Sequence, residues 1–335
     1  MTIEPTLTYV VPVYNTSTYL IRCLQSLVNQ GLSPEEYEIV VVDDGSTDES
    51  VAIVEAFAQE HPQVRLLRQE NAGVSAARNM ALDNSCGRYI QFVDSDDYLC
   101  DGMMVSLLRR AVELDVDALV FNYESVNADG TLSHHGNNDS YPSTDVLSGA
   151  DYLSAHVMTP YVWRFLIRRN FLVQGGWRFD ESLIVCEDGS LIAQFLLNAS
   201  RVAHDEAAPY RYVRRADSAM SNPDRGHLHQ RLLSQVDAAA SIDGTIRKYE
   251  TATGESAPAS VKGLRNVYLF FSMTKALTCG FVPEVLQRIK QAGLYPFPCV
   301  GPESNYQGMK WKVIHGMMMH PRLWVVLSKI YRLIK

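Results

Sequence analysis

The sequence is short of basic residues. Its 335 residues include 30 lysines and arginines against 38 acidic residues, which gives a net charge of −8 and a pI of about 5.6. Binding to the phosphate backbone of nucleic acids depends on an excess of basic residues. The charge balance therefore argues against a general nucleic-acid-binding protein.

Paired cysteines and long apolar runs are missing as well. The six cysteines are scattered without a CxxC spacing, which favours reduced thiols in a cytoplasmic protein. No stretch offers the roughly 20 apolar residues that a membrane-spanning helix requires. The first fifteen residues, MTIEPTLTYVVPVYN, contain neither the basic region nor the apolar run of a signal peptide. We expect a soluble, cytoplasmic protein.

The common phosphate-binding loops are also lacking. No glycine pattern in the chain matches a Walker A loop or a G-x-G-x-x-G turn. The function classes that depend on these loops, ATPases and Rossmann-type dehydrogenases, therefore lose support.

Apolar runs alternate with helical patterns over the first 122 residues. Continuous apolar segments predict strands buried on both faces, as in a parallel sheet. These segments are residues 7–13, 37–42, 64–68, 88–93 and 117–122. Between the first two, Leu20, Leu24 and Leu27 recur at helical spacing. The order implies βαβ units and hence an α/β fold with a mainly parallel sheet flanked by helices.

Carboxylates follow two of these predicted strands. Asp43 and Asp44 come after residues 37–42, and Asp94, Asp96 and Asp97 follow residues 88–93. Like charges this close repel, and carboxylates near a core need a partner or a cation. Ligands of open α/β sheets bind just beyond the carboxyl ends of the strands. A nucleotide with Mg²⁺ or Mn²⁺ on its diphosphate would use these acids. The alternative is a solvated acidic turn that caps a helix.

The remaining chain predicts smaller elements and a helical end. Residues 124–144 are polar and predict a hairpin or loop near the site, and residues 202–204 and 210–214 predict short strands. Ser46 or Thr47, and Asp101, are expected to cap the helices that follow them. Helices are expected at about 227–248, 258–279 and 283–292. We place a domain boundary near residue 225, with two halves at about 1–122 and 123–225 and a helical C-terminal region at 226–335.

Several motifs, taken in their order and spacing, resemble the family 2 glycosyltransferases of the GT-A fold. The likeness is strongest to bacterial enzymes that build capsule, exopolysaccharide or wall-polymer chains, and it covers about residues 7–221. Each motif is weak alone, but the whole set is specific. The motifs are VPVYN at 11–15, CLQSL at 23–27 with Gln30, VDDGSTD at 42–48, NAG at 71–73 with ARN at 77–79, DSDD at 94–97 and the later Glu187-Asp188.

The resemblance implies that residues 1–225 form a GT-A catalytic domain, with a nucleotide-sugar half at about 1–122 and an acceptor half at about 123–225. It also implies a role for each matched position in binding a UDP-sugar. Asp44, or less favourably Asp43, would bind the uracil edge, and Asp94 would contact the ribose. Asp96, as the second acid of the DxD motif, would ligate Mn²⁺ or Mg²⁺. The further residues implied in nucleotide binding are Pro12, Tyr14, Asn71, Arg78 and Ser95.

The resemblance also implies an inverting reaction by direct displacement. Asp188 would deprotonate the acceptor hydroxyl, with Glu187 as its neighbour, while the metal stabilises the departing diphosphate. Asp188 as the N-cap of the following helix is the alternative. A segment with Arg214, Arg215 and Ser218 resembles one that closes over the diphosphate. The chain departs from relatives by having Cys186 before Glu187, by Arg164-Phe165 in place of a polar pair, and by lacking the QxxRW motif of processive synthases.

Taken together, the resemblance predicts a metal-dependent glycosyltransferase that uses a UDP-sugar and a glycan or lipid-linked acceptor in cell-surface polysaccharide synthesis. Two alternatives stay open, a sugar nucleotidyltransferase and a catalytically inactive module that binds nucleotide-sugars. The first would need a glycine-rich basic loop after the first strand, and VPVYN is not one.

The C-terminal tail has a basic amphipathic pattern. Residues 304–335 contain no acids, and Arg322, Lys329, Arg332 and Lys335 fall on one side of a predicted helix at 321–335. Such a helix suits an anionic membrane surface, which would place the protein peripherally on the inner face of the plasma membrane. The alternative is docking on the protein itself or on a second copy in a homodimer.

Overall fold

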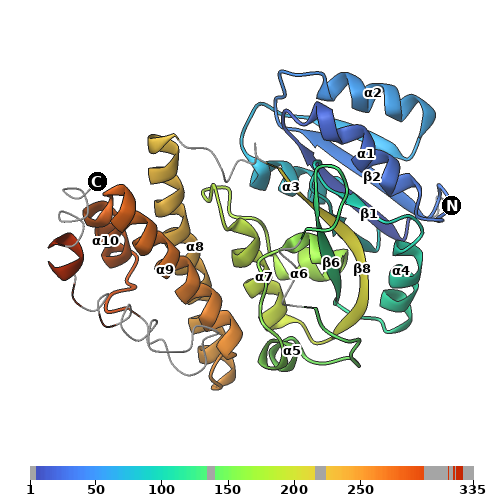
Figure 1. The fold of residues 1–335 in the computed structure, drawn as a ribbon. Coiled ribbons are helices and arrows are strands. Elements are labelled where there is room, and N and C mark those ends of the chain that lie inside the picture. The colour runs from blue at the N-terminus through green and yellow to red at the C-terminus, as the bar shows by residue number, and fades with distance from the viewer. Residues whose placement is uncertain are drawn as a thin grey trace. The chain divides into compact units, whose positions relative to one another are not determined.

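The computed structural model describes residues 5–133, 140–215, 224–297, 316, 320 and 322–326. The chain divides into two compact units (Figure 1). We call the first the sheet unit, which comprises residues 1–152, 161–181 and 198–221. The second is the helical unit, which comprises residues 153–160, 182–197 and 222–335. The functional boundary near residue 225 stays a prediction.

The sheet unit is built on one mixed sheet. Among the described residues it has eight strands in the order β3-β2-β1-β4-β7-β6-β8-β5. The pairs β1–β2, β1–β4, β2–β3 and β6–β8 are parallel, whereas β7 runs antiparallel to both its neighbours and β5 runs antiparallel to β8. The strands are β1 (Leu7–Val13), β2 (Tyr37–Asp43), β3 (Val64–Arg68), β4 (Tyr89–Phe92), β5 (Tyr98–Leu99), β6 (Ala118–Asn127), β7 (Phe165–Arg168) and β8 (Val202–Arg214).

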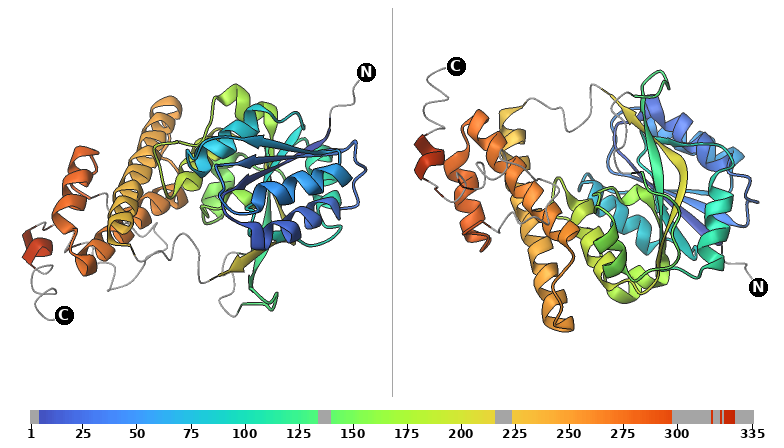
Figure 2. Two further views of the ribbon diagram at one scale, coloured as in Figure 1. Left: turned by 90° about the horizontal axis from the view of Figure 1, so that it is seen from above. Right: turned by 60° about the horizontal axis from the view of Figure 1, so that its bottom comes forward.

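Helices lie on both faces of this sheet (Figure 2). Successive side chains of a strand point to opposite faces, so Tyr9 and Val11 of β1 belong to one core cluster with Leu24 and Leu107, while the equally buried Val10 does not. The continuous apolar run of β1 is thereby buried throughout, and the predicted α/β class is confirmed. The helices are α1 (Ser17–Val28), α2 (Ser50–Glu60), α3 (Val74–Asp83), α4 (Met104–Glu113), α5 (Gly149–Ala155) and α6 (Arg169–Gly175).

Two strand predictions were wrong in extent. The separate short strands expected at 202–204 and 210–214 form the single strand β8, and β6 continues to Asn127 beyond its expected end at residue 122. An antiparallel bridge between Val126 and Leu132 then closes a hairpin, one of the two structures predicted for residues 124–144. β6 and β8 pair in parallel with a shift in register between Phe121 and Tyr123. This irregularity coincides with the polar residues and proline at 205–209, which interrupt the apolar pattern of β8 in the sequence.

The predicted helix caps were also wrong. At the start of α2 the Ser50 N–H donates to Asp48 Oδ1 at 3.0 Å, rather than to Ser46 or Thr47. The first N–H of α4, at Met104, donates to Gln30 Oε1 at 2.9 Å. Asp101 instead accepts a hydrogen bond from Asn29. A cap that comes from a distant side chain leaves no local signal in the sequence.

The helical unit packs α7 (Glu187–Asn198) with α8 (Arg225–Thr253), α9 (Ala259–Cys279) and α10 (Val282–Gln291). The predicted C-terminal helices are confirmed, with α8 extending five residues further than expected. A buried ion pair joins α8 and α9, since Arg265 Nη1 lies 2.6 Å from Asp243 Oδ1. No helix within the described residues is both long and apolar enough to cross a membrane.

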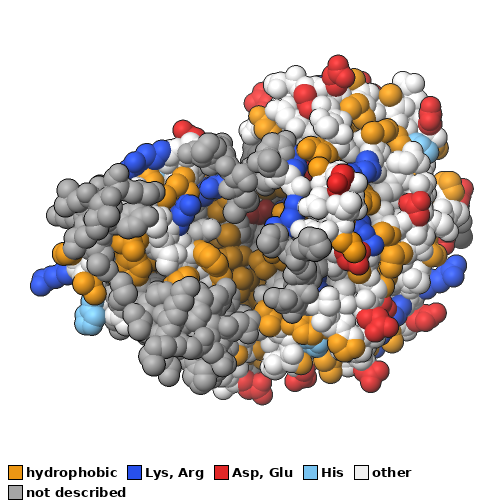
Figure 3. All heavy atoms as spheres, viewed as in Figure 1, with side chains coloured by type: hydrophobic (Ala, Val, Ile, Leu, Met, Phe, Trp, Pro, Cys, Tyr) orange, Lys and Arg blue, Asp and Glu red, His pale blue; other side chains and the backbone are white. Residues whose placement is uncertain are grey.

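Little of the predicted tail helix lies within the described residues. Of residues 321–335, only 322–326 are described, and they are helical. Trp324 is 2% exposed, whereas Leu323 and Val326 are 41% and 50% exposed. In the part of the surface that Figure 3 draws in colour, lysine and arginine side chains are interspersed with acidic ones on the sheet unit.

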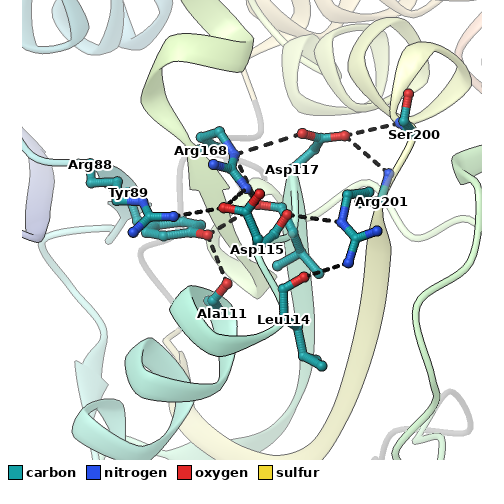
Figure 4. Close-up of polar contacts among 10 residues, drawn as sticks. Arg88, Tyr89, Ala111, Leu114, Asp115, Asp117, Arg168, Ser200 and Arg201 are labelled. Atoms are coloured by element: carbon teal, nitrogen blue, oxygen red, sulfur yellow. Dashed lines mark hydrogen bonds and ion pairs between the residues drawn. The ribbon is translucent and has the colours of Figure 1, made fainter.

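A polar cluster joins the amino ends of β4, β6 and β8 (Figure 4). Asp115, which has a φ of 48°, accepts from Arg88 at 2.7 Å and pairs with Arg168 at 2.8 Å. Asp117 accepts from the backbone N–H groups of Ser200 and Arg201, at 3.0 Å each. This end of the sheet is opposite to the one where the predicted site residues lie.

Tyr89 gives a test of this packing. Its buried hydroxyl donates to the carbonyl oxygens of Ala111, at 2.7 Å, and Val116, at 3.1 Å. The change Tyr89→Phe removes this donor, while the Val116 carbonyl keeps the Arg168 guanidinium and the Ala111 carbonyl keeps the Val116 N–H. We therefore expect the free energy of unfolding to fall by about 1 kcal/mol in urea titrations. Tyr14→Phe, at a half-exposed position, serves as the control. Equal stability of the two variants would contradict the role given to the Tyr89 hydroxyl.

Candidate functional site

The candidate site lies where the chain leaves the neighbouring parallel strands β2, β1 and β4. β1 leads to Tyr14 and Asn15, and β2 leads to Asp44. β4 leads to residues 94–97, which we call the acidic turn. Because the three strands are adjacent, their carboxyl ends meet at one edge of the sheet, where such sheets bind ligands.

The turns after β1 and β2 are tied together by side chains. Asn15, in a left-handed conformation with a φ of 50°, accepts from the Thr47 N–H at 2.8 Å. Asp48 accepts from the N–H groups of Ser17 and Ser50, at 3.0 Å each. Desolvation raises the pKa of Asp48, but hydrogen bonds from Ser50 and Ser17 outweigh it and lower the pKa to about 2. This network holds the segments that follow β1 and β2 together. Pro12, at the end of β1, is buried, and Tyr14, just after β1, is 49% exposed.

Asp44 organises the loop that contains Asn71. Its carboxylate is 4% exposed and accepts from Gln69 Nε2 at 2.7 Å, the Ala72 N–H at 2.8 Å and the Gly73 N–H at 2.9 Å. The neighbouring Gly45 has a φ of 78°, and a Cβ there would lie 3.0 Å from the Asn71 nitrogen. Asp44 therefore holds the exposed Asn71 segment against the end of β2, a role beyond the one the sequence indicated.

Asp94 is paired with a buried arginine. Arg78 Nη2 lies 2.8 Å from Asp94 Oδ1, and the Arg78 guanidinium lies 5.1 Å from the centre of the Phe179 ring. Arg78 is 3% exposed, but the Asp94 side chain is 29% exposed and so faces solvent. The hydroxyl of the adjacent Ser95 is buried and accepts from Thr16 Oγ1 at 3.0 Å.

Asp96 is paired with an arginine from the end of β8. Arg215 Nη2 lies 2.6 Å from Asp96 Oδ2, and the Arg215 guanidinium lies 5.1 Å from the centre of the Tyr19 ring. Burial, followed by the charge of Asp94, raises the pKa of Asp96, and Arg215 offsets this only in part. The carboxylates of Asp94 and Asp96 therefore still repel one another.

Asp97, the third acid of the turn, faces the interior. It is 1% exposed and accepts from Tyr210 Oη at 2.8 Å and from the Val213 N–H at 2.7 Å. Burial, followed by the charges of Asp96 and Asp94, raises the pKa of Asp97 well above its usual value. Burial and the same kind of charge repulsion, from Asp97 and Asp94, raise the pKa of Tyr210.

The donor set fits a divalent cation at Asp96. Among the described residues, no group of three or more His, Cys, Asp or Glu side chains could hold a metal. Mg²⁺ in nucleotide sites is commonly held by one or two carboxylates together with substrate phosphates, so a larger protein cage is not needed. The hard carboxylate oxygens of Asp96 and Asp94, which repel one another, match this chemistry.

Glu187 and Asp188 belong to the helical unit. The helix α7 begins at Glu187, so Asp188 lies in its first turn and the alternative of an N-cap at Asp188 is wrong. Both carboxylates are partly exposed. Cys186 precedes them with a φ of 67°, and burial, followed by the charge of Glu187, raises its pKa to about 12. Acidic groups in the first turn are favoured by the helix dipole.

The other residues singled out from the sequence lie in different surroundings. Arg214 is exposed at the last position of β8, and Ser218 lies outside the described residues. Arg164, the departure from relatives, is buried and donates to the Phe121 carbonyl at 3.0 Å, so it supports the sheet.

The sequence grouped Asp97 with the acids that a nucleotide and its cation would use, but Asp97 faces the interior. No role was predicted for Tyr210. The position of Asp97 beside Asp94 and Asp96 was a sequence signal for a role at the site, whereas the sequence around Tyr210 contains no such signal.

Comparisons with known proteins agree on one family. A family model described as "Glycosyl transferase family 2" matches residues 8–175, half of the chain. The uncharacterized glycosyltransferase YibD of Escherichia coli K12 is 34% identical over 216 residues, which cover 62% of this chain and 60% of YibD. The minor teichoic acid biosynthesis protein GgaB of Bacillus subtilis is 30% identical over 215 residues, which cover 63% of this chain and 23% of GgaB. The chain thus spans less than two thirds of either relative.

A solved structure shares the fold. Residues 1–349 of S. aureus TarS, in complex with UDP, match with a TM-score of 0.67 at 20% identity, over 98% of this chain and 92% of that one. The match extends across both the mixed sheet and the C-terminal helices. The expected GT-A fold is confirmed.

Gly189 gives a test of how α7 is held. A Cβ at this position would overlap the hydroxyl oxygen of Tyr268 on α9 and would lie 3.1 Å from Leu264 Cδ2. We expect Gly189→Ala to lower the free energy of unfolding by about 1–3 kcal/mol through overpacking. In a Tyr268→Phe background the loss should shrink, because the obstructing oxygen is gone.

Urea denaturation of the single and double variants forms a double-mutant cycle. Gly244→Ala, within α8 and with no atom within 4 Å of its would-be Cβ, is the matched control and should be neutral or stabilising. Additive effects of Gly189→Ala and Tyr268→Phe would refute the overlap.

Proposed function

Because the chain belongs to glycosyl transferase family 2, we propose that it transfers a sugar from a UDP-sugar to a glycan or lipid-linked acceptor, with inversion at the anomeric carbon. The observation that carries this proposal is the acidic turn, whose Asp94 and Asp96 are partly exposed at the ligand-binding edge of the sheet and are each paired with an arginine. Similarity to GgaB, a minor teichoic acid biosynthesis protein, supports a place in cell-surface polysaccharide synthesis, and the UDP bound to TarS supports a uridine nucleotide.

The nucleoside would be held by the ends of β1 and β2 together with the acidic turn. Asp44 and the Asn71 segment that it supports would contact the base, beside Pro12 and Tyr14. Asp94 would accept hydrogen bonds from the ribose hydroxyls, with Arg78 and Ser95 fixing its position. Carboxylates suit these roles because base N–H groups and sugar hydroxyls are donors.

The diphosphate would lie against Asp96 and the end of β8. Asp96 would hold Mn²⁺ or Mg²⁺, which when bound supplies charge neutralisation to the leaving diphosphate. Arg215, which pairs with Asp96, and the exposed Arg214 would add positive charge beside it, and Ser218 would contribute from the segment that follows. A site with both carboxylates and guanidinium groups suits a ligand that brings a cation and phosphates together.

Asp188 would be the catalytic base. The acceptor hydroxyl oxygen forms a bond to the anomeric carbon while the bond from that carbon to the diphosphate oxygen breaks, and UDP leaves with the electron pair. The hydroxyl proton passes to the Asp188 carboxylate, with Glu187 as its neighbour in α7. Attack from the face opposite to the leaving group gives the inverted product.

Two matched variants test these roles. With a panel of UDP-sugars and Mn²⁺, we expect the wild type to release UDP and both Asp96→Ala and Asp188→Ala to lose turnover by roughly a hundredfold or more. UDP binding with Mn²⁺ should weaken in Asp96→Ala and stay normal in Asp188→Ala, since only Asp96 would hold the metal. EDTA should reproduce the effect of Asp96→Ala in the wild type.

Asp129→Ala, in an exposed turn, is the control for loss of one acid. Unchanged turnover in both site variants would refute the assignment. Pyrophosphate release from UTP and a sugar phosphate would indicate a nucleotidyltransferase instead, and UDP binding without turnover on any donor would indicate an inactive module.

The tail at 321–335 would bring the enzyme to an anionic membrane surface and so to a lipid-linked acceptor. Arg322 is exposed, as are Leu323 and Val326, which leaves charged and apolar groups available. Co-sedimentation with anionic liposomes should fall when the chain is truncated before Pro321, and high salt should weaken it. Equal sedimentation of both proteins would refute this proposal, and a dimer lost on truncation would favour docking on a second copy.

A further inference from the structure

A buried chain of hydrogen bonds links the acidic turn to the end of β8. The Asp94 N–H donates to Tyr210 Oη at 3.1 Å, Tyr210 Oη donates to Asp97 Oδ2 at 2.8 Å, and the Val213 N–H donates to Asp97 Oδ1 at 2.7 Å. We call these contacts the Asp97–Tyr210 bridge. It joins two segments that are more than 110 residues apart in the chain.

Burial and ring stacking hold both side chains of the bridge in place. Tyr210 is fully buried, and its ring stacks on Trp163 with 4.2 Å between ring centres and 10° between planes. Asp97 is 1% exposed, and each of its two oxygens accepts one of the donors named above. Asp97 thus uses its two oxygens within the interior, whereas the side chains of Asp94 and Asp96 are partly exposed to solvent.

The Asp97–Tyr210 bridge anchors a backbone segment at each of its two ends. At one end it anchors the backbone of Asp94, two residues before Asp96. At the other end it anchors the backbone of Val213, two residues before Arg215, whose guanidinium lies 2.6 Å from Asp96 Oδ2. The charged groups that face solvent thus come from two segments that the bridge holds in one frame.

We propose that Asp97 and Tyr210 are positioning residues that set the geometry of Asp94, Asp96 and Arg215 for a divalent cation and a nucleoside diphosphate. This inference rests on the proposed function and extends it to two residues that touch neither ligand. Carboxylates and a guanidinium that bind one ligand together must be held within a fraction of an ångström, and buried hydrogen bonds to neighbouring backbone groups provide that restraint.

The test compares two buried tyrosine hydroxyls of the same sheet. Tyr210→Phe keeps the ring and its stacking on Trp163 but removes both hydrogen bonds of the hydroxyl. Tyr89→Phe removes two hydrogen bonds at the opposite end of the sheet. Calorimetric titration of the full chain with UDP in the presence of Mn²⁺ should show about tenfold weaker binding for Tyr210→Phe and wild-type binding for Tyr89→Phe, although both lower the thermal midpoint.

Asp97→Asn provides a second, independent variant. Its amide offers one acceptor oxygen where two donors point, so one half of the bridge is lost, and UDP binding should again weaken. The Mn²⁺-dependent gain in UDP affinity, measured against the same titration in EDTA, should shrink in both bridge variants. A purely structural role would lower stability without changing that gain.

The outcomes separate this inference from the proposed function. Wild-type protein that binds UDP, together with unchanged affinity in Tyr210→Phe and Asp97→Asn, would overturn the positioning role alone. An equal loss of affinity in Tyr89→Phe would also overturn it, because the effect would then follow from lower stability. Wild-type protein that binds no UDP with Mn²⁺ would overturn the proposed function and this inference with it.

Discussion

Mutual repulsion among three carboxylates is the constraint on which the rest of the site depends. Asp94, Asp96 and Asp97 lie within four residues at the end of β4, and each is held by a different partner: Arg78 on α3, Arg215 after β8, and a tyrosine hydroxyl with a backbone N–H. An isolated turn could not keep this charge so near a core. The neighbouring elements must therefore be folded around it before the site exists.

The sequence predicted the elements of the sheet well because periodicity is a local signal. Continuous apolar runs located β1 and β3 to the residue, and the acidic motifs identified the edge of the sheet that carries them. The partners of those acids were harder to foresee. Arg215 and Tyr210 lie more than 110 residues beyond the acidic turn, and the pairing of β8 with β5, which directly follows the turn, and with β6 brings them there. The same reason explains the missed cap on α4, which Gln30 supplies.

The two acidic motifs belong to different compact units, which divides the chemistry that we propose between them. The sheet unit carries Asp44, Asp94 and Asp96, the groups suited to a nucleotide and its cation. The helical unit carries Glu187 and Asp188 at the start of α7, whose packing depends on a glycine beside Tyr268. Binding of the leaving group and acceptance of a proton would then depend on residues of separate compact units.

Asp97 accepts a hydrogen bond from the backbone N–H of Val213, so this bond does not depend on which side chain stands at position 213. A backbone N–H is present whatever side chain stands at the position, so any apolar residue that fills the buried space at 213 preserves the bond. Proline alone has no N–H to offer. Position 213 can therefore take different apolar side chains while β8 stays attached to the acidic turn, whereas residue 210, which acts through its own hydroxyl, has no such freedom.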